Sequence, residues 1–414
     1  MKKRILFIML SSPFRPNNGH TMRNYVFLRA LMEEGHQVSL ISFVDREEKD
    51  RPACDLEQMC SSVDRIETPG SGNHRGSGYW NRLQALGSPY PYGAWRFQSP
   101  ELRSAVARRL ASDDYNAVIC DGIYQVQNLP ASGTPPVVLN EHTVTHEALG
   151  RFLKHEVNPL KVLYGWIEFL KVRRWELRAC SRVASIIACS ERDRQILLRA
   201  CPGTDVSVVP NCIDTDAYSP AFDDDGKTLV YVGAMDWAPN QDAVGFFVSD
   251  IFPQVRQAIP DARFLIAGRN PPAAFERRFA GMDGVQVTGS VEDLRPTLAN
   301  AAVSVVPLRS GSGTRIKILE AAAMGKAIVS TSLGAEGLDY ENGGEIVIAD
   351  DPDTFASLVV SLLRDRRRRR SLGCAARSWV VRDHSFTALK SSMSVALGSV
   401  GVSCADRSQC RASA

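Results

Sequence analysis

The sequence feature that most constrains the fold is a glycine-rich segment between an apolar run and a helical pattern. Its residues are Gly311-Ser312-Gly313-Thr314-Arg315-Ile316-Lys317-Ile318-Leu319-Glu320, continuing to Gly325. The preceding residues 302–307 are apolar and β-branched, which predicts a buried strand, and apolar residues at helical spacing follow up to the C-cap position at Gly325. A strand, a glycine-rich turn and a helix in this order direct free backbone N–H groups and a helix N-terminus at one point, which favours an anion.

The charged residues of this segment suit a diphosphate that carries a sugar. Arg315 and Lys317 add two mobile positive charges, and Glu320 adds a hydrogen-bond acceptor one turn into the helix. A diphosphate would contact the cations and the N–H groups, while a sugar hydroxyl would contact the carboxylate. The alternative is an ordinary turn with a solvated charged face, because glycine-rich strand–helix turns are common.

Size and composition indicate a two-domain globular protein. The chain has 414 residues, 44% of them apolar and 23% charged, which is enough for two full cores. A net charge of +3 and the lack of a basic stripe with interleaved aromatics argue against nucleic acid as a partner. The ten cysteines are scattered without a Cys-x-x-Cys pair, which suits a reducing compartment. We expect free thiols at Cys54, Cys60, Cys404 and Cys410.

The N-terminus resembles a signal peptide only superficially. Three basic residues precede an apolar run of six, which is shorter than a usual signal-peptide core and is broken by Ser11-Ser12-Pro13. A first buried strand is the better interpretation. Because no run approaches the ~20 apolar residues of a membrane span, we expect a cytoplasmic protein that can still attach to the inner membrane face.

The first half of the chain has the pattern of a doubly wound α/β domain. A strand over 4–10, a helix from Thr21 to Glu33 and a strand over 38–44 form a βαβ unit, and ligands of such domains sit beyond the strands' C-terminal ends. Gly19, in the loop after the first strand, is therefore placed for close approach to a ligand. The dehydrogenase pattern Gly-x-Gly-x-x-Gly is absent from that loop, which argues against a dinucleotide cofactor.

A histidine follows another predicted strand. His142 comes just after the apolar residues 137–139 and beside Glu141, so it belongs on the ligand-facing rim unless it is a structural histidine. Its i, i+4 spacing to His146 raises the alternative of a metal pair. A third ligand and the His-Glu-x-x-His pattern are lacking, so we predict no metal.

Two further segments of this half have more than one interpretation. Residues 68–100, rich in glycine, serine, proline and aromatics, predict a long loop that either contacts an acceptor or packs structurally. Residues 151–179 combine aromatic and basic side chains, which predicts a long helix with one buried face or, alternatively, a helix lying on an anionic membrane.

The chain changes domain near residue 206, where a second series of strands and helices begins. We expect an N-terminal domain over 1–205, a C-terminal domain over 206–379, a helix over about 380–397 that packs back on the first domain, and a flexible tail over 398–414. The run Arg366–Arg370 is expected at a helix C-terminus, as a solvated surface that complements the helix dipole.

Seven segments together resemble one family. They are residues 189–193, 209–214, 229–240, 303–307, 311–321, 325–331 and 334–338. With these segments the chain resembles the large retaining glycosyltransferase family four, of the GT-B fold, from the first strand to about residue 390. The resemblance implies two Rossmann-like domains facing across a cleft. The implied reaction moves a sugar from a nucleoside diphosphate sugar to an acceptor hydroxyl with retention of anomeric configuration, without a metal or other cofactor.

The resemblance also implies roles for individual residues. Glu320 matches the glutamate that holds the nucleotide ribose, Gly19 the loop that approaches the diphosphate, and His142 the histidine beside the donor sugar. Gly289, Ser290 and Val291 match the region that touches the base. The resemblance places the donor on the C-terminal domain and a glycan or lipid-linked acceptor mainly on the N-terminal one.

The chain departs from the family pattern in three places. The usual carboxylate eight residues before the ribose glutamate is replaced by Ser312, and the usual Arg and Lys after the first strand of the second domain are replaced within the loop that begins at Gly233. Arg315 and Lys317 are therefore our candidates for neutralising the phosphates, together with the backbone of Gly311–Gly313. Gly233, Ser312 and Thr314 are also expected to bind the donor. The third departure is His20 in place of a second glycine, which has no explanation at this level. A nucleotide-sugar epimerase and a non-catalytic sugar-nucleotide binding protein stay open as alternatives.

Overall fold

The chain folds into two compact units. A computed structural model describes residues 2–14, 18–52, 54–69, 77–156, 158–291, 293–311 and 315–400. One unit comprises Met1–Pro210 with Leu389–Ala414, and the other comprises Asn211–Ala388. The first unit therefore ends five residues after the predicted boundary, and the chain returns to it within the last helix. The predicted tail over 398–414 lies outside the described residues from residue 401 on.

The first unit is built on a parallel sheet of seven strands in the order β3-β2-β1-β4-β5-β6-β7. The strands are β1 (Arg4–Met9), β2 (Gln37–Val44), β3 (Ser62–Glu67), β4 (Ala117–Asp121), β5 (Val137–Asn140), β6 (Ser185–Ala188) and β7 (Asp205–Val208). Strands β1, β4, β5 and β6 are buried almost throughout. The segment after the basic N-terminus is thus a central strand of the sheet.

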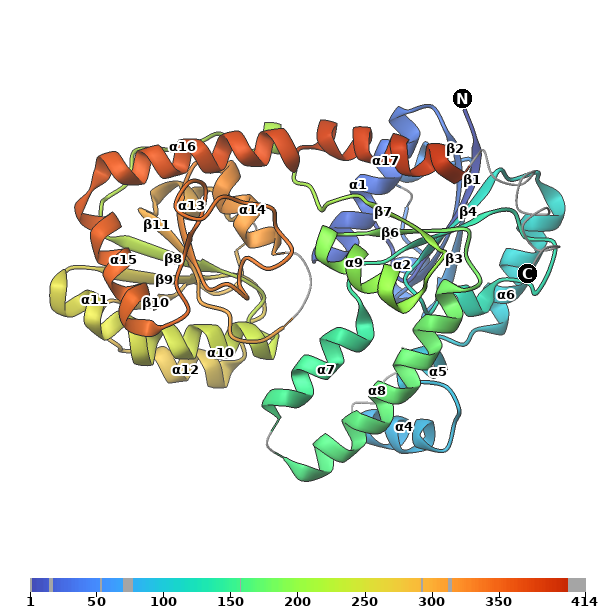
Figure 1. Ribbon diagram of the computed structural model, residues 1–414, viewed down its shortest axis with the longest axis horizontal. Helices are drawn as coiled ribbons and strands as arrows, with labels where there is room; N and C mark the ends of the chain where they lie inside the picture. The colour runs from blue at the N-terminus through green and yellow to red at the C-terminus, as the bar shows by residue number, and fades with distance from the viewer. Residues whose placement is uncertain are drawn as a thin grey trace. The chain divides into compact units, whose positions relative to one another are not determined.

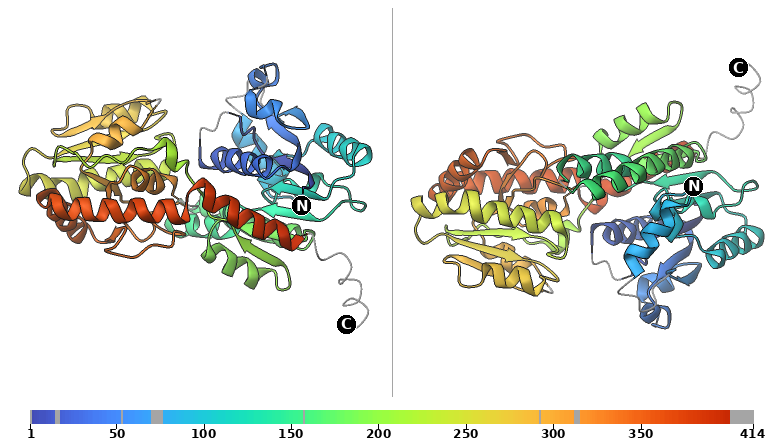
Figure 2. Two further views of the ribbon diagram at one scale, coloured as in Figure 1. Left: turned by 90° about the horizontal axis from the view of Figure 1, so that it is seen from above. Right: turned by 90° about the horizontal axis from the view of Figure 1, so that it is seen from below.

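Helices flank this sheet (Figure 1, Figure 2). They are α1 (Gly19–Glu33), α2 (Arg46–Lys49), α3 (Asp55–Gln58), α4 (Ser77–Leu86), α5 (Tyr92–Arg96), α6 (Pro100–Ser112), η1 (Val126–Asn128), α7 (Thr145–His155), α8 (Pro159–Cys180), α9 (Glu191–Ala200) and α17 (Phe386–Val400). Helix α17 is tied to this unit by an ion pair between Lys390 and Glu33 and by a hydrogen bond from Lys3 to the Leu397 carbonyl.

The second unit has a parallel sheet of six strands in the order β10-β9-β8-β11-β12-β13. The strands are β8 (Thr228–Val232), β9 (Arg263–Ala267), β10 (Val285–Val287), β11 (Val303–Val306), β12 (Ala327–Ser330) and β13 (Val347–Ile348). Its helices are η2 (Thr215–Ala217), α10 (Ala238–Phe246), η3 (Phe247–Ile251), α11 (Phe252–Ala258), α12 (Ala273–Phe279), α13 (Arg295–Asn300), α14 (Ile316–Ala323), α15 (Pro352–Arg364) and α16 (Arg366–Asp383).

Both sheets are doubly wound, as the sequence predicts. In each, the strand order reverses beside the first strand, between β1 and β4 in the first unit and between β8 and β11 in the second. Ligands of open parallel sheets bind beyond the strands' C-terminal ends at such a switch point. The fold therefore defines one candidate site in each unit.

Three sequence predictions need correction. Residues 68–100 are not one long loop, because α4 and α5 fold within them, although residues 70–76 lie outside the described part. Tyr90 packs edge-on against Trp175, and the Tyr92 amide donates to buried Glu168, so this segment packs on α8. Residues 151–179 form two helices, because Asn158 caps α8 and Pro159 occupies its first turn.

The third correction concerns the arginine run. Helix α15 ends at Arg364, and Asp365 caps α16, so the run from Arg366 lies at a helix N-terminus, where it does not complement the dipole. Four of its five side chains are exposed, which confirms a solvated surface for them. Arg369 is the exception. Its guanidinium is 4% exposed and binds Asp224 at 2.6 Å and the carbonyls of Leu362 and Leu363 at 2.8 Å.

We expect Arg369→Ala to destabilise the second unit strongly. Removing one partner of a buried ion pair leaves Asp224 uncompensated and costs about 3–5 kcal/mol. In calorimetry of the full chain, the melting temperature of the second unit should fall by roughly 10 °C. The matched control is Arg366→Ala, since Arg366 pairs with Asp223 at 2.8 Å but both side chains are exposed. An equal loss in the two variants would contradict the burial argument.

Candidate functional site

Three ionisable side chains meet at the switch point of the first unit. His20 lies in the first turn of α1, after β1, while Asp121 ends β4 and His142 follows β5. The parallel pairing of β1 with β4 and of β4 with β5 brings these chain segments to the same edge of the sheet. His142 therefore lies on the strand-end rim where the sequence predicts it.

The buried carboxylate of Asp121 is shared by both imidazoles. His142 Nε2 lies 2.5 Å from Asp121 Oδ1, and His20 Nε2 lies 2.9 Å from Asp121 Oδ2. The two rings stack with their centroids 4.1 Å apart. The Leu10 amide and the Asn24 side chain also donate to Oδ2, at 3.0 and 2.7 Å. Asp121 is fully buried, whereas both histidine side chains keep a partly exposed face.

The environment of this cluster shifts the pKa values of the two histidines in opposite directions. Burial lowers the pKa of His142 to about 4, because the attraction of Asp121 does not compensate for desolvation and His20 adds repulsion. Burial also acts to lower the pKa of His20, but the attraction and hydrogen bond of Asp121 outweigh it, so this pKa is raised. Although burial opposes it, the two histidines hold the pKa of Asp121 well below its usual range. Asp121 is therefore the carboxylate of the cluster, His142 is neutral at neutral pH, and His20 is the histidine that holds a proton more readily.

The carboxylate that reaches His142 is Asp121 and not the neighbouring Glu141. Burial, followed by repulsion from Glu176 and Asp121, raises the pKa of Glu141 well above its ordinary value. His146, the other half of the possible metal pair, binds Glu176 through Nδ1 instead. Among the described residues, the group with metal-ligand geometry is His20, Asp121 and His142, whose ligand atoms all lie within 4.8 Å of one another. That chemistry also suits a divalent transition metal, so independence of metals stays a prediction.

The loop after β1 ends in a capped helix. Asn18, rather than Thr21, is the N-cap of α1, and the two residues form a reciprocal capping box. Gly19 is the first residue of α1, next to His20. The cap positions His20 so that its ring faces Asp121 from the helix N-terminus.

In the second unit, Lys317 is held at the switch point by two residues of the β8 side. Its Nζ donates to Tyr231 Oη at 2.7 Å and to Asn240 Oδ1 at 2.9 Å. A Cβ atom on Gly233 would lie 3.0 Å from this Nζ, so glycine at the end of β8 makes room for the lysine. Burial and the repulsion of Arg315 lower the pKa of Lys317 well below its ordinary value.

Arg315 is the second cation of this site and is 4% exposed. It occupies the N-cap position of α14 and lies close to Gly311, whose φ of +104° is a backbone conformation that favours glycine. The sequence suggests mobile charges, but the Arg315 side chain is buried and two hydrogen bonds hold the Lys317 ammonium group. Ser312, Gly313 and Thr314 lie outside the described residues.

Glu320 lies one turn into α14, on the same helix as Lys317. Tyr218 Oη donates to its Oε1 at 3.3 Å. Burial raises the pKa of Glu320 to about 7, although Tyr218 and Lys317 favour the ionised form. A carboxyl group in this state can change its protonation when a hydroxyl or a charged group arrives.

The predicted base-contacting residues lie at the end of β10. Gly289 has a φ of +73°, and Ser290 Oγ accepts a hydrogen bond from the Asn270 amide at 3.0 Å, while Val291 packs against the core. Asn270 also donates to Asp236 at 3.1 Å, which links this loop to the one after β8.

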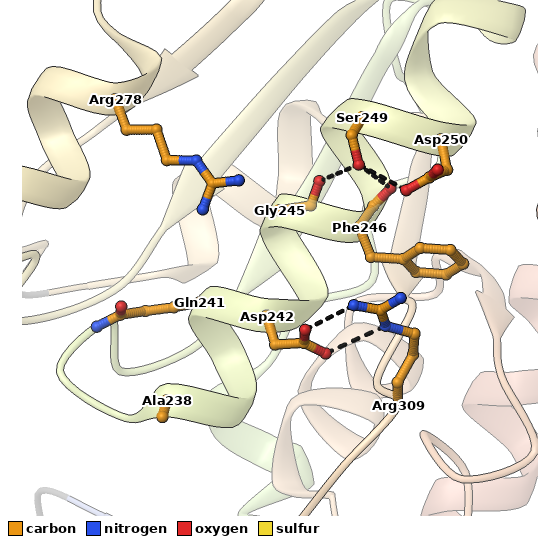
Figure 3. A pocket seen from close by; sticks show the side chains of 9 residues that line it. All are labelled: Ala238, Gln241, Asp242, Gly245, Phe246, Ser249, Asp250, Arg278 and Arg309. Carbon is orange, nitrogen blue, oxygen red and sulfur yellow. Dashed lines mark hydrogen bonds and ion pairs between the residues drawn. The ribbon is translucent and has the colours of Figure 1, made fainter. Parts of the chain in front are cut away.

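A separate polar groove of about 370 Å³ lies along α10 (Figure 3). Arg309 binds Asp242 there at 2.6 Å and packs over the Phe246 ring, 4.4 Å from its centroid. Of the predicted site residues that the structure describes, none lines this groove.

Sequence reasoning missed the partners that orient the predicted residues. Asp121 directly follows an apolar strand, which is a readable signal for a rim position, but its pairing with residue 20 requires the sheet order. Tyr231 and Asn240 lie 86 and 77 positions from Lys317, so no local pattern connects them. Tyr218, the partner of Glu320, is likewise distant in the chain.

Known proteins resemble this chain over both units. Residues 17–217 match the family described as Glycosyltransferase Family 4, and residues 226–365 match Glycosyl transferases group 1. The chain is 22% identical over 406 residues to a protein of Klebsiella pneumoniae described as an uncharacterized 44.6 kDa protein in the cps region, covering 94% of this chain and 98% of that protein.

Two further proteins are similar to this chain, one over about half of its length and one at low sequence identity. The phosphatidyl-myo-inositol mannosyltransferase of Mycolicibacterium smegmatis is 26% identical over 198 residues, covering 45% of this chain and 50% of that enzyme. The chain thus matches about half the length of the mannosyltransferase. The structure of Anabaena HepE in complex with UDP aligns with a TM-score of 0.66 and 13% identity, covering 96% of this chain and 100% of that one.

The two family matches cover consecutive parts of one chain, and the HepE likeness extends over both sheets. The two doubly wound sheets are thus those of a GT-B protein, and the chain belongs to the group 1, family 4 glycosyltransferases.

Proposed function

We propose that this glycosyltransferase moves a hexose from a nucleoside diphosphate sugar to an acceptor hydroxyl, with retention of anomeric configuration. The observation that carries the proposal is the pair of cations at the start of α14. Arg315 and Lys317 repel one another in a poorly solvated turn, which lowers the pKa of Lys317. An anion bound there would relieve this repulsion, and the helix N-terminus adds to its attraction.

Breaking the bond between a sugar and a diphosphate builds negative charge on the departing group and positive charge on the sugar ring. Preorganised cations aimed at the leaving group lower that barrier without a covalent intermediate. Arg315 and Lys317 would serve this role, since neither has to be ordered when the donor binds. Gly233 would act indirectly, because the space that a Cβ atom would take there holds Lys317 and Asn240. Gly311 would offer its backbone to the diphosphate, and the loop from Gly289 to Val291 would contact the base.

Glu320 would hold the ribose of the nucleotide. A carboxylate accepts hydrogen bonds from two neighbouring hydroxyls, and such charge-assisted bonds contribute about 1.5–3 kcal/mol each. The ionised form is the one that accepts both bonds. Because the pKa of Glu320 is about 7 in the free protein, donor binding would be linked to its ionisation.

In the first unit, His142 would hydrogen-bond the transferred sugar. Its neutral ring donates from Nε2 to Asp121, which leaves Nδ1 as an acceptor for a sugar hydroxyl. Asp121 is then a positioning residue that fixes the tautomer of His142 and raises the pKa of His20. Gly19 would allow a phosphate or hydroxyl to approach the N-terminus of α1.

The descriptions of the relatives support a proposal for the substrate class. HepE is described in complex with UDP, the mannosyltransferase is named for phosphatidyl-myo-inositol, and the Klebsiella protein is described by its place in a cps region. We propose a glycan or lipid-linked acceptor, in polysaccharide or glycolipid assembly in the cytoplasm at the inner membrane face. No metal or other cofactor is required in this mechanism.

Nucleotide binding tests the cation pair. UDP and GDP are titrated separately into the full chain, and the melting temperature should rise with the correct one. Lys317→Met should weaken that binding by about ten- to a hundredfold, because a charge-assisted contact to phosphate is lost. Lys227→Met is the matched control, since Lys227 lies in the same unit but pairs with Asp261 at the surface. Equal binding by the wild type and Lys317→Met would contradict the phosphate role.

Turnover separates the transferase from the two alternatives. Product formation from the bound donor and a glycan or lipid extract, with the anomeric configuration read by NMR, should show transfer with retention. The rate should be unchanged in excess EDTA. Conversion of donor without an acceptor would indicate an epimerase, and binding without any turnover would indicate a non-catalytic protein.

The affinity for the nucleotide should rise with pH through the ionisation of Glu320. For a group with a pKa of about 7 that binds only when ionised, the dissociation constant falls about tenfold between pH 6 and pH 8. Lys317 has the opposite effect on affinity, because it loses its positive charge as the pH rises. Calorimetric titrations of wild type and Glu320→Gln at both pH values separate the contribution of Glu320 from that of Lys317. The change in dissociation constant between pH 6 and pH 8 should differ between the two proteins by about tenfold. An equal change in both proteins would show that Glu320 does not contact the nucleotide.

The shared carboxylate can be tested through the histidine protons. NMR titration should give His142 a pKa near 4 and His20 a pKa above 6.5, with His20→Gln and His142→Gln supplying the assignments. In Asp121→Asn, the pKa of His20 should fall below 6.5, because desolvation remains while the attraction is lost. An unchanged His20 in Asp121→Asn would show that another group holds its proton.

A further inference from the structure

Helix α8 has an apolar stripe on the side that faces away from its own unit. The stripe consists of residues that are 38–77% exposed, namely Leu160, Leu163, Trp166, Ile167 and Leu170. With 3.6 residues per turn these positions share one helix face. The buried positions of α8 include Gly165, Glu168, Val172, Glu176 and Ala179, which fall on roughly the opposite face. The stripe is therefore not used to pack α8 on the sheet.

Helix α7 pairs with α8 and extends the exposed apolar surface. Figure 1 shows the two helices as a hairpin that projects from the sheet of the first unit beside α4. Leu153 of α7 packs onto Gly165, where a Cβ would lie 2.2 Å from its Cδ2. Phe152, the next residue to Leu153, is 56% exposed. Six of the twelve exposed large apolar side chains in the described part of the chain lie on this hairpin, which is a concentration expected of an interaction surface.

Basic residues predominate around the stripe. The exposed charged residues in the described part of α7 and α8 are Lys154, Lys161, Arg173, Arg174 and Arg178. Two acidic residues of the hairpin are also solvent-accessible or paired with these cations: Glu147 lies 4.0 Å from Arg192 of α9, and Glu156 lies 3.8 Å from Lys161. The acidic residues Glu168 and Glu176 are turned inward, where they accept from the Tyr92 amide and from the Thr145 amide. Arg173 and Arg174 follow Leu170 by three and four positions, so they continue the line of the stripe.

We propose that the hairpin of α7 and α8 docks on the surface of a lipid bilayer that contains anionic lipids. The stripe enters the boundary between headgroups and acyl chains, with Trp166 at the level where indole rings are favoured. The basic side chains bind the lipid phosphates and acidic headgroups. No helix in the described part of the chain has the length and hydropathy to cross a bilayer, so the contact is made from one side.

Charge decides between a membrane and a second copy of the chain. Pairing two stripes face to face would bring two sets of basic side chains together, which costs free energy. An anionic surface neutralises the same charges. The proposal does not depend on the transferase reaction, because the stripe and the basic residues lie outside both switch points.

Vesicle flotation of the full chain tests the proposal. The protein should float with vesicles of phosphatidylcholine containing about 30% phosphatidylglycerol and much less with phosphatidylcholine alone. A triple variant, Leu163→Ser/Trp166→Ser/Leu170→Ser, should bind at least tenfold more weakly, since three side chains no longer leave water. Because these side chains are exposed, its melting temperature should match that of the wild type.

Two further variants separate the apolar and charge contributions. Arg173→Gln/Arg174→Gln should lower the preference for anionic vesicles by about thirtyfold, given ~1 kcal/mol for each basic residue near the surface. Val395→Ser, at an exposed apolar residue of α17 in the same unit, should bind like the wild type. The insertion depth of Trp166 is measured by the quenching of tryptophan fluorescence with brominated lipid. This quenching should be lost in Trp166→Phe.

Three results would overturn the proposal. The first is the absence of vesicle binding by the wild type, and the second is equal binding to neutral and anionic vesicles. The third is a dimer in gel filtration that the triple variant dissociates while neither protein floats, which would assign the stripe to a second copy. Wild-type transferase activity alongside any of these results would leave the proposed function intact.

Discussion

Parallel pairing between strands that are far apart in the sequence places every candidate functional group of this chain. The β1–β4 pairing aligns Ile5 with Ala117 and carries the loop containing His20 to the end of the strand that finishes at Asp121. The β8–β11 pairing aligns Leu229 with Val303 and brings Gly233 beside the turn that leads into α14. Both pairings form the switch point of their sheet, so one topological rule yields two sites.

The two sites have opposite electrostatic characters. In the first unit a buried carboxylate is already satisfied by two imidazoles, an amide and a side-chain amide, so little net charge is left for a ligand to neutralise. In the second unit two cations share one turn, and Glu320 one helical turn away has a raised pKa. A neutral polyhydroxyl ligand suits the first arrangement, and an anion suits the second. A nucleoside diphosphate sugar contains both kinds of group, which agrees with the proposed substrate class.

The sequence predicted what depends on local patterns and missed what depends on the sheet order. The strand before Gly311, the helix after Arg315 and the strand-end position of His142 follow from apolar periodicity and turn residues, and the structure has them. The division into α7 and α8 was also readable, because Asn158 and Pro159 form a helix start, but the continuous apolar pattern masked it. By contrast, the Asp121 carboxylate and the Tyr231–Asn240 pair act through contacts across strands. No spacing in the sequence relates them to His20 or Lys317.

The amphipathic pattern of α8 is ambiguous for a related reason. A helix with one buried face has a clear amphipathic pattern, whereas α8 is apolar on two nearly opposite faces and has acidic residues on the buried one. Glu176 is tolerated inside because the Thr145 amide and the His146 ring satisfy it, while Glu168 accepts from the Tyr92 amide through one carboxyl oxygen. Leaving five apolar side chains in water gains nothing for the isolated fold. The stripe therefore indicates a second environment in which those side chains are buried, and the basic residues beside it make a bilayer with anionic lipids the environment that fits best.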